Sequence, residues 1–198
     1  MEAQGLRERK RLETHRAFIQ AARELVDARG VDGVTVEEIA DAAGYTSRTF
    51  FNHFSCKEEA VVAYDPVTLA RLGDELRARP PEESPAEALL AVLTAGVESE
   101  GIVQRWLFRH QLVTRDPKLL PSYLAAMDQV ESVLTLALAE RIGVDPTSDP
   151  RLRMLVAGVL ATTRAGINWW SESDRTRPLL SILAEAFDLI SPTPTSRT

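Results

Sequence analysis

Cysteine is almost missing from this chain, since Cys56 is its single cysteine and no intramolecular disulfide can form. This scarcity argues against the disulfide-stapled secreted domains and fits a reducing compartment. No apolar run approaches the roughly 18 residues that span a bilayer, and residues 1–10 lack the apolar core of a signal peptide. We therefore expect a cytoplasmic protein without a membrane segment.

Motifs that carry enzyme chemistry are also lacking. The three histidines, His15, His53 and His110, lie far apart in the chain, and no His/Cys cluster has the spacing of metal ligands. Neither a glycine-rich phosphate loop nor a nucleophile signature occurs. The sequence therefore predicts a protein that is not an enzyme and that holds no metal and no cofactor.

Positive charge is scarce overall, because the net charge is −6. The acidic excess is larger after residue 63 than before it, and residues 1–16 hold five basic and three acidic side chains. Affinity for phosphate depends on where the charge lies, so a locally basic face can serve an acidic protein. Arg7, Arg9, Lys10 and Arg11 either contact a DNA backbone or form an ordinary solvated charge run.

The chain of 198 residues, 44% of them hydrophobic, is large enough to bury a core. Its apolar residues recur at helical spacing, and no strand pattern or internal repeat occurs, so the fold class is all-α with about nine helices. The expected helices run over about 7–29, 36–43, 47–54, 56–78, 85–100, 102–113, 122–141, 150–172 and 178–190.

The most informative stretch runs from residue 35 to residue 57. Thr35 and Glu38 form a capping box that opens a short helix, and Gly44 ends it because glycine enters the left-handed conformation freely. Thr46 can cap a second helix, which Phe50 and Phe54, four residues apart, would pack onto the first. Helix, tight turn and helix is the spacing of a DNA-binding helix-turn-helix.

Two further signals follow this motif. Ser55 and Glu58 read as a second capping box opening the next helix. Pro66 deletes a backbone hydrogen bond, so that helix should either kink there or restart with Asp65 as its cap.

Residues 14–62 resemble the DNA-binding domain of the TetR family of transcriptional regulators. The resemblance is carried by Ala21-Ala22, Leu25, Gly30, Val36, Ile39-Ala40, Ala43-Gly44, Thr46, Thr49, Phe54 and Lys57-Glu58. Phe51 stands where the family often has tyrosine, and Cys56 where it often has proline or serine. The resemblance implies a three-helix, homeodomain-like DNA-binding domain over 1–63 and a helical ligand-binding and dimerisation domain over 64–190, followed by a disordered tail at 191–198.

By this resemblance, the second helix of the motif reads double-stranded DNA and its flanks hold phosphates. The implied DNA-binding residues are Thr35, Thr46, Ser47, Arg48, Thr49, Phe51, Asn52, His53 and Lys57. Arg48 is the candidate for specificity, because its fork of donors matches guanine. Phe51 is a candidate for a thymine methyl group or a sugar, or alternatively for the core.

The last two expected helices are unusually apolar. A four-helix bundle formed with a second copy of the chain would bury both, so we expect a homodimer through 150–172 and 178–190 that binds an inverted-repeat operator.

The remaining apolar surface suggests an effector pocket, although residues of this kind are more often packed core. Candidate lining residues are Leu93, Val97, Arg105, Trp106, Arg109, His110, Tyr123, Met127 and Asn168. Arg48 to Asn52 together with Leu138 to Gly143 resembles the TetR branch with an acyl-CoA-like ligand-binding domain. The expected function is a repressor that such a ligand releases through a hinge near Pro66; the alternative is a helical small-molecule carrier or interaction module that does not bind DNA.

Overall fold

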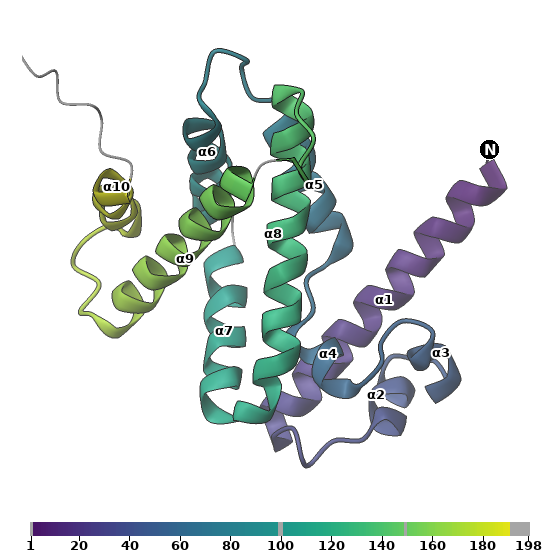
Figure 1. Cartoon of the computed structure of the whole chain (residues 1–198). Coiled ribbons are helices and arrows are strands. Elements are labelled where there is room, and N and C mark those ends of the chain that lie inside the picture. Colours follow the sequence, from purple (N-terminus) through teal and green to yellow (C-terminus); the bar gives the residue numbers. More distant parts are fainter. Residues whose placement is uncertain (1, 99–100, 149, 191–198) are drawn as a thin grey trace, which may run out of the picture. The chain divides into compact units, whose positions relative to one another are not determined.

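The computed structural model describes residues 2–98, 101–148 and 150–190, which form helices joined by turns, without strands (Figure 1). The all-α fold class is therefore confirmed. The helices are α1 Glu2–Arg29, α2 Val36–Ala42, α3 Ser47–Phe51, α4 Lys57–Val62, α5 Pro66–Arg77, α6 Pro85–Glu98, α7 Ile102–Arg115, the short 3₁₀ helix η1 Pro117–Leu119, α8 Leu120–Ile142, α9 Pro150–Glu172 and α10 Leu179–Ile190.

Two compact units make up the fold, residues 1–70 with 109–129 and residues 71–108 with 130–198. The described residues hold ten α-helices where about nine were expected, because the stretch expected as one helix over 56–78 forms α4 and α5. The first helix begins at Glu2 and not at Arg7 as expected. The tail predicted to be disordered, 191–198, lies outside the described residues.

The first unit is built around a cluster of aromatic rings beneath the helix-turn-helix. α1 packs against α2 and α4, and α2 packs against α3 (Figure 1). Phe18 and Phe50 are fully buried, and their ring centroids are 5.2 Å apart in an edge-to-face arrangement. Phe54 is 3% exposed and lies 5.5 Å from Phe50. The predicted core role of Phe50 and Phe54 follows from this packing, because aromatic rings contribute a large buried apolar area.

The capping box predicted for Ser55 and Glu58 is wrong. Cys56 is the N-cap of α4 and its side chain makes no capping hydrogen bond. The backbone N–H and the hydroxyl of Ser55 instead both donate to the Glu59 carboxylate, at 2.7 Å each. Ser55 lies one residue before the N-cap, and the Glu59 carboxylate, four residues further on, accepts its hydrogen bonds. These bonds stabilise the start of α4 in place of a side-chain cap.

Of the two possibilities at Pro66, the structure has the restart. α4 ends at Val62, and α5 begins at Pro66 with Asp65 before it. The Asp65 carboxylate accepts from the backbone N–H of Val67 at 3.0 Å and from the Thr68 hydroxyl. Proline at the first helical position lacks only an N–H that would have no partner, so the junction costs little.

The second unit holds α9 and α10 packed together, with α6 also against α9. α6 opens with a capping box, in which Ser84 N–H donates to Glu87 at 2.8 Å and Glu87 N–H donates to the Ser84 hydroxyl. A Cβ at Gly166 would lie 2.6 Å from Cδ2 of Leu183, so a larger residue there would force the Leu183 side chain to move. Among the described helices, none has the length and apolar character needed to span a bilayer.

Candidate nucleic-acid interface and effector residues

The start of α2 is anchored to the end of α1. Thr35 accepts from Glu38 N–H at 3.2 Å, and Glu38 accepts from Thr35 N–H at 2.8 Å, which completes the predicted capping box. The Arg29 guanidinium donates to the same carboxylate at 2.7 Å. Arg29 first, and then Thr35, lower the pKa of Glu38. The carboxylate therefore stays ionised and joins the two helices.

The turn before α3 uses the predicted glycine. Gly44 has φ +78°, and Tyr45 N–H closes the turn by donating to Ala40 O at 2.9 Å. The Tyr45 ring then lies 5.3 Å from that of Phe18. Thr46 caps α3 by accepting from Thr49 N–H at 3.2 Å. These contacts hold the short helix α3 at a defined angle, although five residues alone would not form a stable helix.

α3 has one buried face and one exposed face. Phe50 is fully buried, whereas the neighbouring Phe51 is 56% exposed. Arg48 and Asn52 are exposed too, and Ser47 and Thr49 are half-buried. A surface helix that presents arginine, asparagine and an aromatic ring beside each other offers the contacts used to read base edges.

Two of the predicted phosphate ligands have other partners. The Lys57 ammonium donates to Val31 O at 2.7 Å and to Val34 O at 2.8 Å, so it holds the loop between α1 and α2. His53 turns its ring toward His15, 5.7 Å away, and burial followed by the nearby Arg11 lowers its pKa. Their contact with phosphate remains a prediction, and their structural roles could not be read from local sequence.

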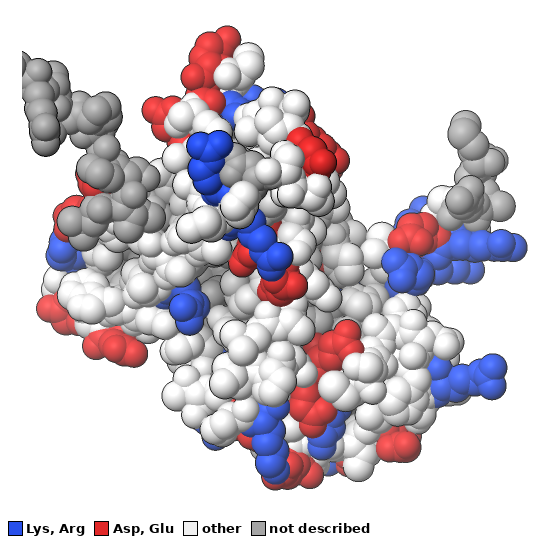
Figure 2. All heavy atoms as spheres, in the orientation of Figure 1, with Lys and Arg blue, Asp and Glu red and all other residues white. Residues whose placement is uncertain are grey.

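Positive charge gathers over the N-terminal part of α1 (Figure 2). Part of this charge is compensated on the same helix, since Arg9 pairs with Glu13 and Arg11 with Glu8. These pairs are exposed and contribute little to stability. Contact of this stretch with a DNA backbone remains a prediction.

Two arginines of α1, which no sequence pattern singled out, hold the α4–α5 junction. Arg16 donates to the Asp65 carboxylate at 2.9 Å, and Arg23 donates to the carbonyls of Val61 and Ala63. Burial raises the pKa of Asp65, but hydrogen bonds from Arg16 and the Val67 N–H outweigh it, and the pKa lies below its usual range. The partners are about 40 to 50 positions apart in the chain, so no local pattern could have signalled them.

The predicted effector residues fall into both units. In the first, the Arg109 guanidinium carbon lies 3.9 Å above the ring of Tyr64, whose hydroxyl is 3.3 Å from the Met127 sulfur. Tyr123 is buried and His110 half-buried in the same unit. Arg109 is only 6% exposed, so this cation is held by an aromatic face inside the protein.

The other predicted effector residues belong to the second unit. Leu93, Val97, Trp106 and Asn168 are half-buried, and Arg105 is exposed. The side-chain oxygen of Asn168 is buried without a hydrogen-bond partner among the described residues. A buried amide oxygen without a partner is unusual in protein interiors.

A helix-turn-helix with an exposed reading face defines this chain as a DNA-binding transcriptional regulator. Residues 18–64 match the bacterial regulatory proteins of the tetR family, and residues 80–194 match the MftR C-terminal domain. The chain is 35% identical over 201 residues to the HTH-type transcriptional regulator TcmR of Streptomyces glaucescens, a match that covers 95% of this chain and 87% of that protein. It therefore belongs to the TetR family.

Solved structures share the fold. FadR of Thermus thermophilus, a TetR-family repressor in complex with lauroyl-CoA, superposes with a TM-score of 0.53 at 23% identity, covering 92% of this chain and 100% of that one. SmeT, the repressor of the Stenotrophomonas maltophilia efflux pump SmeDEF, gives 0.51 at 20% identity and 89% coverage of both chains. At these identities the likeness concerns the fold alone.

Proposed function

We propose that this protein is a cytoplasmic, homodimeric repressor that binds an inverted-repeat operator and is released by a small apolar or acyl-type effector. The observation that carries the proposal is the division of α3 into a face buried through Phe50 and a face exposed through Arg48 and Phe51. A helix that packs on the protein through one face can insert its opposite face into a major groove without losing that packing.

On the operator, Arg48 donates two hydrogen bonds to a guanine and Phe51 contacts a thymine methyl group or a sugar. Ser47 and Thr49 lie on the same short helix and Asn52 is its C-cap, and all three contact neighbouring bases or the backbone. Thr35, Thr46, His53 and Lys57 are the proposed phosphate contacts, which would set the register without reading sequence.

Dimerisation is proposed through α9 and α10, and the structure offers a surface suited to it. Much of the apolar stripe of α9 is already used inside the chain, since Leu152, Val156, Val159 and Ile167 are buried. An exposed stripe remains on α9, formed by Met154, Gly158, Ala161, Ala165 and Trp169. Small residues at its centre allow a second helix to approach closely. A dimer would present two copies of α3 to half-sites about 34–36 Å apart.

The effector proposal draws on the buried Arg109 of the first unit. An arginine beside an apolar interior suits a ligand with an anionic group and a fatty chain, and the T. thermophilus relative was solved with lauroyl-CoA. The junction at Asp65 and Pro66 is the proposed hinge. A coupling free energy of about 1–3 kcal/mol would change operator affinity roughly 5- to 150-fold.

The first test is operator selection followed by substitution of Arg48. Selection from random DNA should yield an inverted repeat, and Arg48→Ala should then weaken operator binding roughly thirtyfold or more, since two half-sites each lose a base contact of about 1–3 kcal/mol. Arg71→Ala, the same change in α5, is the control and should bind like wild type. Equal operator affinity of Arg48→Ala and wild type, or no selected sequence at all, would favour the carrier alternative.

The second test concerns the effector. Lauroyl-CoA should stabilise the protein by about 2.7 kcal/mol at a hundredfold excess over its Kd and should release operator DNA in a fluorescence anisotropy titration. Coenzyme A without the acyl chain should do neither. Unchanged melting temperature with acyl chains of every length would remove the acyl-type effector while leaving the DNA-binding proposal intact.

A further inference from the structure

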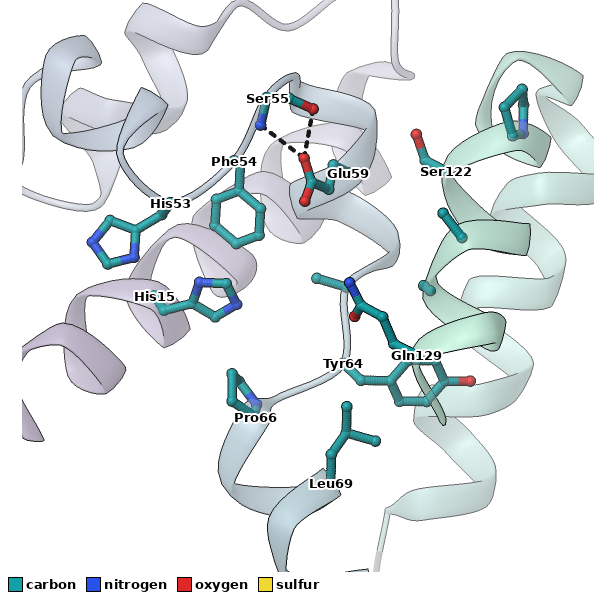
Figure 3. Close-up of a pocket in the computed structure, with 14 residues that line it drawn as sticks. His15, His53, Phe54, Ser55, Glu59, Tyr64, Pro66, Leu69, Ser122 and Gln129 are labelled. Carbon is teal, nitrogen blue, oxygen red and sulfur yellow. Dashed lines mark hydrogen bonds between the residues drawn. The ribbon is translucent and has the colours of Figure 1, made fainter. Parts of the chain in front are cut away.

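A cavity of about 610 Å³ lies in the unit that carries the helix-turn-helix (Figure 3). None of the residues predicted for the effector pocket lines it. Its walls are His15, His53, Phe54, Ser55, Glu59, Ala63, Tyr64, Pro66, Leu69, Pro121, Ser122, Ala125, Ala126 and Gln129. This volume lies within the range of small-molecule sites, about 300–1,000 Å³.

One wall of the cavity is aromatic. The rings of His15 and Phe54 stack at 4.3 Å with 25° between their planes and His53 lies beside them, whereas Tyr64 lies apart from these three, next to Gln129 of α8 (Figure 3). Flat faces of this kind attract other flat rings through offset stacking and edge contacts. The wall therefore favours an aromatic ligand over a branched or purely aliphatic one.

The charge of the walls is negative or neutral. Glu59 is the carboxylate among the lining residues, which include no lysine or arginine. Its Oε2 is held by Ser55 through two hydrogen bonds of 2.7 Å, so the charge has a defined position in the wall. Burial lowers the pKa of His15 and of His53, and both rings are therefore mostly uncharged near neutral pH.

The wall across from His15, His53 and Phe54 offers polar groups. Ser122 and Gln129 contribute them from α8 (Figure 3).

We propose that this cavity is a second binding site, distinct from the proposed effector pocket, for small flat aromatic molecules that are neutral or singly positively charged. Stacking comes from the rings that line the cavity, and a positive charge meets Glu59. Anionic ligands such as acyl-CoA are disfavoured by the same carboxylate.

A ligand in this cavity would alter operator binding. His53 and Phe54 directly follow the last turn of α3, and Pro66 begins α5 at the proposed hinge. The occupant therefore touches both the DNA-reading element and the segment that leads away from it. By linkage, operator DNA changes the affinity of the ligand by the same factor as the ligand changes that of DNA.

The test uses two fluorescent probes on the same ring system, aminoacridine as the cation and acridine carboxylate as the anion, with the full chain and without DNA because aminoacridine intercalates. Wild type should bind aminoacridine saturably and at least about tenfold more tightly than the anion. Glu59→Gln should reduce that preference by about tenfold. No saturable binding of aminoacridine, or an unchanged preference in Glu59→Gln, overturns the proposal.

Two tryptophan substitutions locate the probe. Ala125→Trp fills the cavity from α8 and should abolish aminoacridine binding, whereas Leu124→Trp, at a 58% exposed neighbour that does not line the cavity, should leave it unchanged. Both variants should retain their melting temperature, and Leu124→Trp should bind operator DNA like wild type, which separates loss of this site from loss of the fold. Binding by Ala125→Trp that equals wild type would place the probe elsewhere and overturn the proposal.

Discussion

Replacing Phe50 by alanine should destabilise the helix-turn-helix unit by about 3–5 kcal/mol, the range for deleting a buried phenylalanine. Phe50 has no exposed surface and contacts both Phe18 and Phe54, so the substitution leaves a cavity at the place where α3 is attached. Chemical denaturation followed by circular dichroism measures the loss. Operator binding should disappear with it, because α3 has no other large anchor.

The matched control is the neighbouring phenylalanine. Phe51→Ala removes the same side chain at a position that is 56% exposed, so the free energy of unfolding should change by no more than about 0.5 kcal/mol. Operator affinity should nevertheless fall, since Phe51 belongs to the proposed reading face. Equal destabilisation by the two substitutions would mean that the assignment of buried and exposed faces to α3 is incorrect.

Ala161→Glu should convert the protein into a monomer at micromolar concentration. Ala161 is exposed at the centre of the α9 stripe, and a dimer through this stripe would bury two carboxylates without partners. Operator affinity should fall roughly 10²- to 10⁴-fold, because linking two reading helices raises their effective concentration on adjacent half-sites. Light scattering coupled to size exclusion reports the mass, and anisotropy reports DNA binding.

The control for this prediction introduces the same charge elsewhere. Ala78→Glu lies just after α5 at another exposed position and should leave both the mass and the operator affinity unchanged. A dimer that persists in Ala161→Glu would move the interface away from this face of α9. A monomer that still binds its operator as tightly as wild type would argue against two-fold recognition.

Much of the helix-turn-helix could be predicted because its signals are local. Thr35 and Glu38 are three residues apart, and Gly44 ends α2 by its own conformational freedom. Asp65 followed by Pro66 likewise indicated that a new helix could begin there, and α5 does begin at Pro66. A cap can still be misjudged by one residue, as at Ser55, because its position depends on which residue leaves helical geometry and not on residue type alone.

Roles that join distant segments escaped prediction. Lys57 was expected to bind phosphate, but its ammonium meets carbonyls 23 and 26 positions earlier in the chain. His53 shared the same expectation and lies against His15 in the wall of a cavity that no sequence motif announced. The residue type alone does not reveal whether a lysine or a histidine faces solvent, a backbone carbonyl or another ring, because that depends on segments distant in the chain.

The helices α9 and α10 show which properties follow from the sequence and which follow only from the tertiary structure. The sequence alone determined that they are helical and apolar and that a proline stands at the start of each, since these properties depend on neighbouring residues. Only the tertiary structure decided that Leu152, Val156 and Ile167 face inward while Met154, Ala161 and Trp169 face solvent. The physical reason is that periodicity gives the angle between residues around a helix, whereas the direction of each face is set by what packs against it.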